Sequence, residues 1–392
     1  MLLEGLKVVE MSTWIAGPGC AGVMADWGAD VVKVEAPGGD AIRAFYPDTA
    51  ESPGNPIFTN ENRGKKGVLL DVTKPEGRTA LIAILRNADI FITNVRPGSM
   101  KRLRLDYDSL KGELLKMIYC AITGYGLVGP DADTPAFDLT GFWTRSGVAH
   151  ATIPPDVEPF GCRPGFGDHS TAMATLSAIL AALYERHSTG RGRLVETSLI
   201  RMGAYAIGWD LSIQLRYGQV VTAQPRDKRM NPISGYVRTK DDRWIFLSPR
   251  TLQCFTNVMI AVDHPEALAD ERYQQPFQSL EVVAELRDMI EEGFGKMTLA
   301  EASDKLKELD LIWAPMETIQ TMSESEVAHL AGCFETVSDG WGGTMRVPAA
   351  PARFPEGAPP ISRAAPKLGE HTREVLAAAG LAPHEINAAM GI

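Results

Sequence analysis

The chain has 392 residues, of which 45% are hydrophobic and 22% are charged, and its formal net charge is −10. This length allows two domains, or one large domain with an insertion, and the composition is that of a globular protein with a filled core. The negative charge argues against nucleic acid or an anionic membrane as a partner, so an anionic ligand needs local basic residues.

Strand and helix patterns alternate over the first part of the chain. Apolar runs predict strands over Leu6–Met11 and Asp30–Glu35, with a helix over Ala16–Trp27 that is entered through a glycine turn. A strand, a helix and a strand within about thirty residues form a βαβ unit, which implies a parallel sheet. The alternation continues with a helix over Thr79–Asn87 and with strands over Gly67–Val72, Asp89–Thr93 and Lys116–Thr123.

The middle of the chain predicts a long helix and then a change of architecture. Ser170–His187 is apolar and rich in alanine, as expected of a buried helix, and precedes a strand over Arg193–Ser198 and a helix to about Gln214. After about Pro225, strands over Gly235–Lys240 and Arg243–Ser248 flank a hairpin turn. Helices follow over Leu252–Val262, Leu280–Glu291 and Leu299–Glu308. These elements predict a smaller α+β domain over residues 225–320.

Prolines then gather in one segment, which predicts an extended connector: Pro348, Pro351, Pro355, Pro359, Pro360 and Pro366. A helix over Thr372–Ala379 that stops at Gly380, and a short helix near His384–Met390, end the chain. His371 is placed to help cap the first of these two helices.

A glycine pattern near the start, Gly17-Pro18-Gly19-Cys20-Ala21-Gly22, formally matches the fingerprint of a dinucleotide-binding βαβ unit. Two features weigh against that interpretation. The residues from Ser12 onward separate the strand from the glycines, and Pro18 removes a backbone N–H donor that would face a pyrophosphate. The competing interpretation is a tight strand-to-helix turn within an α/β sheet.

Basic residues gather at two places in this acidic chain: Arg63, Lys65 and Lys66, and then Arg96, Lys101, Arg102 and Arg104. Either cluster could be a solvated face, which is the usual role of a charge run. The second begins in the loop after the predicted strand Asp89–Thr93, and such loops bind ligands in open α/β sheets. Arginine is suited to bidentate phosphate binding, so we expect a phosphate role for at least one of these arginines.

A carboxylate follows a glycine turn in Gly165-Phe166-Gly167-Asp168, just before the predicted helix Ser170–His187. Asp168 could cap this helix, but Ser170 or Thr171 could cap it equally well and would leave Asp168 free. A free carboxylate at the positive end of a helix stays ionised, and nearby backbone N–H groups can stabilise an oxyanion. Both interpretations are open from the residues alone.

Several other chemistries find no motif. The sequence has no P-loop, no GxSxG elbow, no HExxH and no cysteine or histidine pair at metal spacing, so we expect no metal. The five cysteines are scattered, the N-terminus lacks a signal-peptide pattern, and no apolar stretch approaches membrane-spanning length. These features predict a cytoplasmic protein with reduced thiols.

Taken together, the segments resemble the class III CoA-transferases, also called the CaiB/BaiF family. The matching segments run almost from end to end: LKVVE, IAGP, WGADVVKVE, NRGKKGVLLDV, ADIFITNVRPGSMKRL, ITGYG, FGDHSTAM, ALYERHSTGRG and APKLGEHTREVLAAAGL. The resemblance implies an acyl-CoA:carboxylate CoA-transferase with CoA thioesters as substrates and no tightly bound cofactor. It also implies that Asp168 is the nucleophile, forming first an aspartyl anhydride and then an aspartyl-CoA thioester.

The resemblance also implies where CoA binds. The family's CoA contacts fall on Trp14, Ile15, Ala16, Leu70, Asn94, Val95, Arg96, Arg102, Leu103, Thr123 and Tyr125, with Arg102 as the phosphate partner. Thr123 stands where the oxalate-specific relative has a lysine, which argues against oxalate or formate as substrate.

The run Thr123–Val148 is most similar to the 2-hydroxyacyl and aryl-lactate branch of the family. It implies an acceptor acid with an apolar body, with Trp14, Phe137, Asp138, Phe142 and Trp143 as its lining. The racemase branch carries a histidine before the position of Asp138, where this chain has Phe137. Phenylalanine accepts no proton, so transfer is favoured over α-methylacyl-CoA racemisation. Two further functions stay open, an NAD-dependent oxidoreductase and a non-catalytic CoA-binding or assembly protein.

The family forms an interlocked, ring-like homodimer, and the order of elements here fits that architecture. We therefore predict an α/β fold in which residues 1–215 and 335–392 form a large Rossmann-like CoA-binding domain with a parallel sheet. The small α+β domain covers 225–320, and residues 216–224 and 321–334 are linkers.

Overall fold

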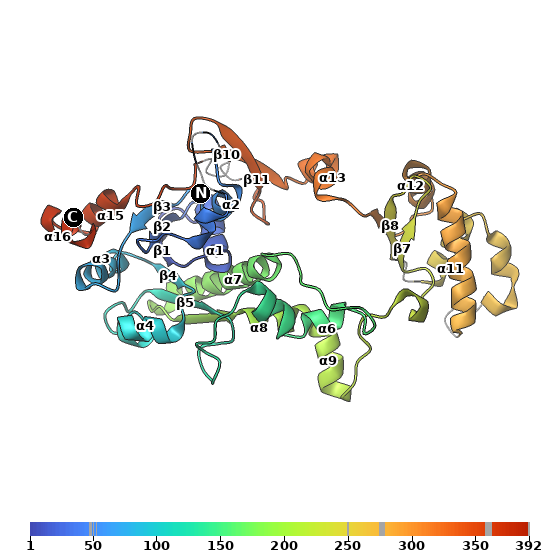
Figure 1. The fold of residues 1–392 in the computed structure, drawn as a ribbon, viewed down its shortest axis with the longest axis horizontal. Coiled ribbons are helices and arrows are strands. Elements are labelled where there is room, and N and C mark those ends of the chain that lie inside the picture. The colour runs from blue at the N-terminus through green and yellow to red at the C-terminus, as the bar shows by residue number, and fades with distance from the viewer. Residues whose placement is uncertain are drawn as a thin grey trace. The chain divides into compact units, whose positions relative to one another are not determined.

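The computed structural model of the chain describes residues 1–46, 49, 51, 53–248, 251–273, 279–356 and 363–390. It divides into two compact units (Figure 1). Met1–Thr152, Pro159–Val220 and His329–Ile392 form the larger unit, and Ile153–Glu158 and Val221–Ala328 form the smaller one. Pro359 and Pro360 of the predicted connector lie outside the described residues.

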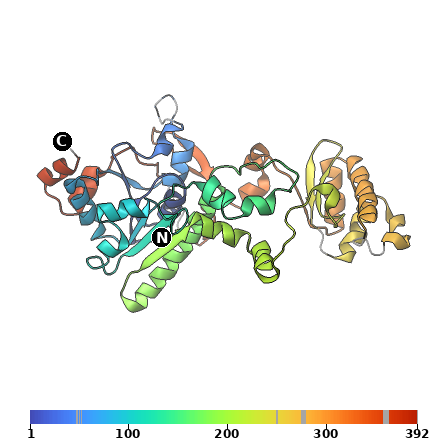
Figure 2. The same ribbon diagram turned by 60° about the horizontal axis from the view of Figure 1, so that its bottom comes forward.

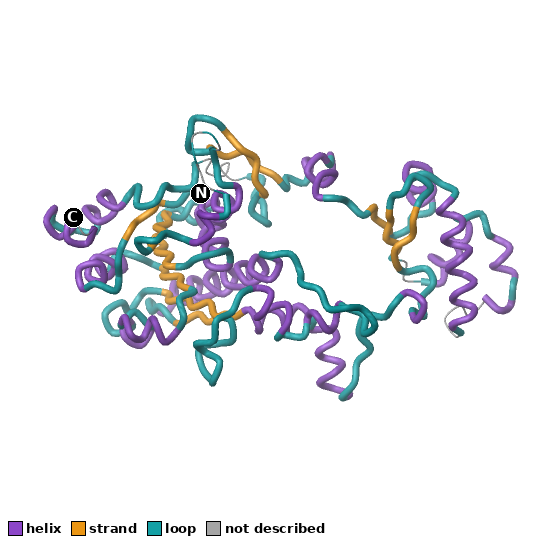
Figure 3. Tube along the Cα trace, in the orientation of Figure 1, coloured by secondary structure: helices purple, strands orange, loops and turns teal. Residues whose placement is uncertain are grey.

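A six-stranded sheet forms the centre of the larger unit, in the order β3-β2-β1-β4-β5-β6 (Figures 1 and 3). All neighbouring pairs are parallel, which confirms the predicted α/β fold. The strands are β1 (Lys7–Met11), β2 (Asp30–Glu35), β3 (Lys66–Leu69), β4 (Ile90–Thr93), β5 (Ile118–Thr123) and β6 (Leu194–Ser198). The strand order reverses direction between β1 and β4, and ligands bind at such a switch point in open α/β sheets.

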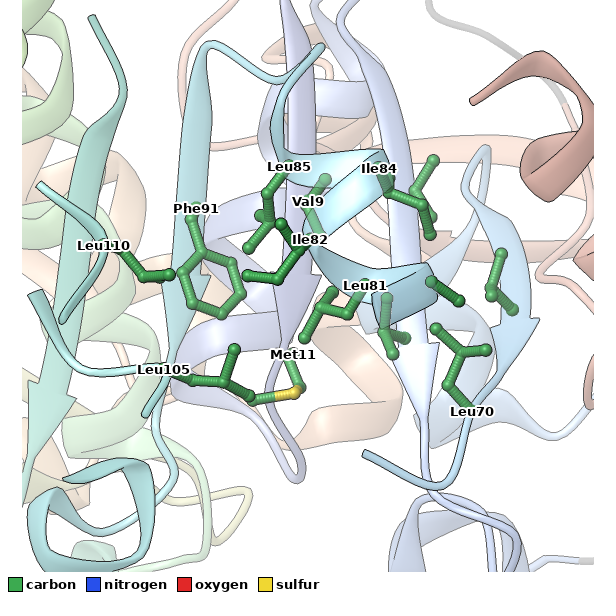
Figure 4. Packing of buried hydrophobic residues seen from close by; sticks show 14 of the residues in the cluster. Val9, Met11, Leu70, Leu81, Ile82, Ile84, Leu85, Phe91, Leu105 and Leu110 are labelled. Atoms are coloured by element: carbon green, nitrogen blue, oxygen red, sulfur yellow. The ribbon is translucent and has the colours of Figure 1, made fainter. Parts of the chain in front are cut away.

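Helices cover both faces of this sheet, so successive side chains of a strand enter different cores. Val8 of β1 belongs to the core formed with α1 (Ala16–Asp26) and α7 (Phe166–Thr189), the long helix drawn in green in Figure 2. Val9, the next residue, belongs to the opposite core, where Leu81 and Leu85 of α3 (Pro75–Leu85) pack (Figure 4). The C-terminal helices α15 (Thr372–Ala378) and α16 (Pro383–Met390) contribute to this second core.

The glycine pattern near the start does not form the predicted turn. Helix α1 already begins at Ala16, so Gly17, Gly19 and Gly22 are buried inside it. A Cβ on Gly22 would lie 2.7 Å from the carbonyl oxygen of Glu61, which belongs to α2 (Pro56–Asn62). A Cβ on Gly19 would lie 2.7 Å from Oε2 of the same glutamate. The glycines thus allow α1 to pack closely on α2, and they form no turn that a dinucleotide could occupy.

Several elements of the larger unit differ from the sequence-based expectation. The helix expected to continue to Gln214 is interrupted at Ile207, giving α8 (Leu199–Ala206) and α9 (Gly208–Tyr217). An antiparallel hairpin of β10 (Phe334–Ser338) and β11 (Thr344–Pro348) was not predicted. The remaining helical segments are η1 (Ala41–Ala44), α4 (Pro97–Leu103), α5 (Tyr107–Leu110), the π-helix η2 (Leu139–Thr144) and α6 (Val148–Thr152).

The smaller unit has its own core and an antiparallel sheet in the order β7-β8-β9. Strands β7 (Gly235–Arg238) and β8 (Trp244–Leu247) form the predicted hairpin, and β9 (Trp313–Pro315) pairs with β8. The predicted helices are present as α10 (Leu252–Ala261), α11 (Leu280–Gly295) and α12 (Leu299–Glu308). Short segments η3 (Arg226–Lys228), η4 (Pro265–Ala269), η5 (Glu271–Tyr273) and α13 (Ile319–Glu324) complete it, and α14 (Glu326–Leu330) ends across the boundary between the units. No helix in the described parts of the chain is both long enough and apolar enough to cross a membrane.

Candidate active site

The loops that leave β1 and β4 are tied together at the switch point of the sheet. The Thr13 N–H donates to Asn94 Oδ1 at 3.0 Å, and Asn94 Nδ2 donates back to the Thr13 carbonyl at 2.7 Å. This reciprocal pair fixes the loop that leads into α1 against the loop that leads into α4.

A cavity of about 430 Å³ opens beside these two loops. Its walls come from the loops after β1 and β4, the end of β5, the segment around residues 132–137, and the N-terminal turn of α7. The residues that line it are Thr13, Trp14, Ala16, Asn94, Val95, Arg96, Pro97, Ser99, Ile122, Thr123, Gly124, Ala132, Thr134, Pro135, Ala136, Phe137, Asp168 and Leu199.

Many of the residues expected to bind substrate meet in this cavity. Those that line it are Trp14, Ala16, Asn94, Val95, Arg96, Thr123, Phe137 and Asp168. Those that do not line it are Ile15, Leu70, Arg102, Leu103, Tyr125, Asp138, Phe142 and Trp143.

Packing explains why the second group lies elsewhere. Leu70 is 1% exposed in the core beneath α3 (Figure 4), and Leu103 packs against the same core. Arg102 donates to Ser99 Oγ at 2.8 Å, within its own helix. The guanidinium of Arg145 covers the Tyr125 ring, 4.5 Å from its centre.

Two of the four aromatic residues expected to line the acceptor site, Phe142 and Trp143, are buried instead. Phe142 is 1% exposed, and its ring occupies the space where a side chain on Gly167 would lie. Trp143 is also buried, and its indole N–H donates to the Phe160 carbonyl at 2.8 Å. Neither side chain lines the cavity, since Phe142 packs against the start of α7 and Trp143 is hydrogen-bonded to the Phe160 carbonyl.

Two of the three residues of the first basic cluster, Arg63 and Lys65, are buried, so they do not form the solvated face that was one expectation. Arg63 is 3% exposed and pairs with Asp26 at 2.6 Å and with Glu335 at 2.8 Å. Lys65 is equally buried and pairs with Glu10 at 2.9 Å. Because burial of a charge requires such partners, these two residues stabilise the large unit and are not available to bind a phosphate.

A network of buried charges lies beneath the loop that follows β1. Lys33 Nζ donates to Asp40 Oδ2 at 3.0 Å, to Glu10 Oε1 at 3.2 Å and to the Ser12 carbonyl at 3.1 Å. The side chains of Lys33, Asp40 and Glu10 are all 0% exposed. The other oxygen of Asp40 accepts the Trp14 N–H at 3.2 Å, so the network also holds the loop that lines the cavity.

Trp14 has a backbone φ of +69°, which a tryptophan rarely adopts. In this conformation its ring makes edge contacts with Phe137, at 5.2 Å between centroids, and with Phe45, at 5.7 Å. Trp14 and Phe137 together give one wall of the cavity an apolar, aromatic surface.

Asp168 lies inside α7, whereas the sequence placed it before the helix. The helix begins at Phe166, after Gly165 with a φ of +92°, so Asp168 is its third residue. Neither Ser170 nor Thr171 caps it, because their hydroxyls donate back to the carbonyls of Phe166 and Gly167 at 2.9 and 2.8 Å. Asp168 forms no side-chain cap either, and its carboxylate lines the cavity.

The expectation that Asp168 simply stays ionised is wrong. Burial and, to a smaller extent, the negative charges of Asp138 and Glu61 raise the pKa of Asp168 to about 7, although the neighbouring His169 opposes the rise. Near neutral pH both the carboxylate and the protonated acid are therefore populated. The charge of the helix N-terminus is not enough to offset burial beside a second carboxyl group.

A histidine–glutamate pair that was not predicted lies next to Asp168. His169 Nε2 is 2.9 Å from Glu61 Oε1, and the Glu61 side chain is only 3% exposed. The hydrogen bond and the charge of Glu61 raise the pKa of His169, which favours the imidazolium form. Among the described residues, no group of three or more His, Cys, Asp and Glu side chains is placed to hold a metal ion.

Comparison with known proteins points to one family. The model of CoA-transferase family III matches residues 3–372. The chain is 34% identical over 391 residues to (R)-2-hydroxy-4-methylpentanoate CoA-transferase of Clostridioides difficile, covering 99% of this chain and 98% of the relative. It is 30% identical over 401 residues to cinnamoyl-CoA:phenyllactate CoA-transferase of Clostridium sporogenes, covering 98% and 95%. A solved CaiB/BaiF family protein from Brucella suis superposes with a TM-score of 0.84 at 26% identity, covering 96% of this chain and 99% of that one.

Proposed function

We propose, from the premise that this chain belongs to CoA-transferase family III, that it moves CoA from an acyl-CoA thioester to a carboxylic acid through covalent intermediates on Asp168. The position of Asp168 supports this reaction most directly. Its carboxylate lines the cavity at the switch point of the sheet, in the first turn of α7. Backbone N–H groups at a helix N-terminus can stabilise negative charge that develops on a reacting carbonyl.

The proposed reaction has four steps and needs no other reactant. The Asp168 carboxylate attacks the thioester carbonyl, the C–S bond breaks, and CoA thiolate leaves a mixed anhydride on the enzyme. The thiolate then attacks the aspartyl carbonyl, which releases the donor acid and forms an aspartyl-CoA thioester. The acceptor carboxylate attacks this thioester, and the thiolate leaves a second anhydride. Attack of the thiolate on the acceptor carbonyl yields the new acyl-CoA and restores the Asp168 carboxylate.

We propose a 2-hydroxy acid with an apolar body as the acceptor. Two relatives are named for 2-hydroxy-4-methylpentanoate and phenyllactate, whose side chains are branched aliphatic and aromatic. The aromatic wall of Trp14 and Phe137 supports this choice, because it offers apolar surface to such a side chain and no charge to a second carboxylate.

For CoA itself, the cavity favours a revised assignment of the phosphate partner. Arg96 lines the cavity, whereas Arg102 bonds to Ser99 and lies outside it. We therefore propose Arg96 in place of Arg102, with Asn94, Val95 and Thr123 beside it.

The test is a transfer assay followed by mass spectrometry of the CoA esters. With an acyl-CoA donor, (R)-2-hydroxy-4-methylpentanoate and phenyllactate should each become CoA esters, and oxalate should not. The same reactions in D₂O separate transfer from racemisation, because Phe137 supplies no base for proton exchange. Deuterium exchange at Cα without any new CoA ester would contradict the proposal.

The rate should depend on pH through the ionisation of Asp168. Since the attacking form is the carboxylate and the pKa of Asp168 is raised to about 7, kcat/KM for the acyl-CoA should fall on the acid side of pH 7. At pH 6 it should be about tenfold below its plateau. A pH series of initial rates measures this, and an acid limb near pH 4, the range of an ordinary aspartate, would contradict the assignment.

We also propose that the protein is a cytoplasmic homodimer, interlocked as in its family. In this proposal residues 1–215 and 335–392 form the large domain, and residues 225–320 form the small domain. Apolar side chains on α9 support an interface, since no residue of this helix is buried. Trp209, Leu215 and Tyr217 are 83%, 78% and 71% exposed, which is unusual for large apolar groups on a monomer.

Introducing charge on α9 should therefore prevent dimer formation. The double variant Trp209→Glu and Leu215→Glu should elute as a monomer in size-exclusion chromatography with light scattering, because charged residues oppose burial of this surface. Lys111→Glu, at an exposed position that follows α5, is the control and should remain dimeric. A double variant that dimerises as the wild type does would place the interface elsewhere.

A further inference from the structure

The N-terminus of α7 carries the proposed nucleophile but has no cap of its own. Gly165 occupies the N-cap position and has no side chain to accept a hydrogen bond. Helices leave their first N–H groups without intrahelical partners, and a cap normally satisfies them. Here the acceptor comes from a distant part of the chain, since Asp138 Oδ1 accepts the Gly167 N–H at 3.0 Å.

The side chain of Asp138 packs closely against the start of α7. It is 4% exposed and precedes the π-helix η2, whose Phe142 packs under the same turn of α7. A Cβ on Gly167 would lie 2.5 Å from Asp138 Oδ1 and would overlap the Phe142 ring. Only glycine allows the start of α7 to approach Asp138 so closely.

The second oxygen of Asp138 makes this group more than a cap. Asp138 Oδ2 is buried and has no hydrogen-bond partner among the described residues. A buried carboxylate oxygen without a hydrogen bond raises the free energy of the folded state, and capping alone does not require a charged side chain. The hydrogen bond from Gly167 joins Asp138 to the residue immediately before Asp168, which brings two carboxyl groups together at one helix terminus.

We propose that Asp138 is a positioning residue for Asp168. Its side chain holds the first turn of α7 in place of an N-cap, and its charge controls the ionisation of the nucleophile. The inference rests on the proposed role of Asp168. It replaces the sequence-based assignment of Asp138 to the substrate lining, because the side chain does not reach the cavity.

The charges around Asp168 show how this control works. Asp138 and Glu61 are the negative groups that act on Asp168, and His169 is the positive one. Burial raises the pKa of Asp138 as well, although the backbone N–H groups of residues 165, 167 and 168 and the charge of His169 oppose the rise. Two neighbouring carboxyl groups disfavour simultaneous ionisation, so they titrate as a coupled pair. Cys162 also lies in their field, and burial together with the charges of Asp138 and Asp168 raises its pKa.

The coupling has a direct consequence for the reaction. Acylation converts the Asp168 carboxylate into a neutral anhydride or thioester, which removes one of the two like charges. Repulsion from Asp138 therefore destabilises the free nucleophile more than the acylated one, and this favours attack on the thioester.

The test uses Asp138→Asn and Asp138→Ala in the full-length protein, with the rate of covalent labelling of Asp168 by acyl-CoA measured from pH 5.5 to 8.5 by peptide mass spectrometry. Asparagine keeps an oxygen acceptor for the Gly167 N–H and removes the charge, whereas alanine removes both. Asp89→Asn is the matched control. Asp89 Oδ2 also accepts a backbone N–H, that of Lys7 at 2.9 Å, but Asp89 lies at the opposite end of β4 from the cavity. Thermal unfolding of each variant is followed in parallel.

Asp138→Asn should move the acid limb of the labelling rate from about pH 7 to lower pH by about one unit, with little change in unfolding. Asp138→Ala should also lower the plateau rate about tenfold, because the first turn of α7 is no longer held. Asp89→Asn should keep the wild-type limb. An unmoved limb in Asp138→Asn would overturn the inference while labelling of the wild type at Asp168 still supported the function. Absence of labelling in the wild type would instead reject the proposed nucleophile.

Discussion

Asp168→Asn should lower kcat for CoA transfer roughly 10⁴-fold, with a change of less than about threefold in KM for the acyl-CoA. Asparagine has nearly the same size and shape, but an amide does not form the anhydride on which all later steps depend. The cavity walls keep their positions, so binding of the substrate is largely retained. Initial rates over a range of acyl-CoA concentrations separate the two constants.

The stability of this variant provides its control. The pKa of Asp168 is raised in the folded protein from 3.8 to about 7, so the folded state binds the proton more tightly than the unfolded state. Ionisation of Asp168 therefore costs stability as pH rises through this range, and the cost is present above pH 7. At pH 8, Asp168→Asn should melt no lower than the wild type. More than about a tenth of wild-type kcat in a variant that is folded by this criterion would exclude the covalent mechanism.

Glu10→Gln should destabilise the large unit by about 3–5 kcal/mol, and this is the largest effect on stability that we expect. Glu10 Oε1 accepts from Lys33 at 3.2 Å and Oε2 accepts from Lys65 at 2.9 Å, with all three side chains 0% exposed. Burial alone would raise the pKa of Glu10, but the charges of the two lysines outweigh it and lower the pKa to about 2. The variant leaves two buried lysines with too little negative charge beside them.

Thermal unfolding at pH 7.5 measures this effect, and the Tm should fall by roughly 6–10 °C. Because the pKa of Glu10 is lowered, its contribution is complete above pH 4.5 and is lost only as pH falls toward 2. The control is Glu113→Gln, which breaks an exposed pair with Arg86 and should change stability by less than about 1 kcal/mol. An equally small effect in Glu10→Gln would show that the buried network does not stabilise the fold.

The parallel sheet was predictable because its signal is local. Each strand is a short apolar run, and the helices between them require crossover connections. The first residues of helices α1 and α7 were not predictable, because contacts with distant parts of the chain determine them. In the sequence, the glycines of α1 resemble a turn. Glycine is required at two of these positions because Glu61, on another helix, lies too close for a larger side chain. Helix α7 begins at Phe166 and not at Ser170 because Asp138, far away in the chain, supplies its acceptor.

In the candidate site, too, some features were predictable from the sequence and others were not. The order of the segments and the family resemblance led to Asp168, and the loops after β1 and β4 lie where an α/β sheet binds ligands. The burial of Arg63 was missed because its partners, Asp26 and Glu335, lie far from it in the sequence. The pair of Glu61 and His169 was also missed, although each lies in or beside a segment that supports the family resemblance. Their contact spans 108 positions, and no local pattern indicates it.

The raised pKa of Asp168 had no local signal either. A carboxylate at a helix N-terminus is ordinarily stabilised, and only burial next to Asp138 reverses the direction. The family resemblance indicated Asp168 as the nucleophile that we propose, but the ionisation of this residue depends on groups that the fold brings to it.

The most direct measurement is peptide mass spectrometry of the protein after incubation with an acyl-CoA donor and no acceptor. The covalent mechanism predicts an acyl or CoA adduct on the peptide that contains Asp168, present in the wild type and absent from Asp168→Asn. Addition of a 2-hydroxy acid should then remove the adduct and release the acid as its CoA ester. Turnover by the wild type with no adduct on this peptide, or an adduct that persists in Asp168→Asn, would show that Asp168 is not the nucleophile.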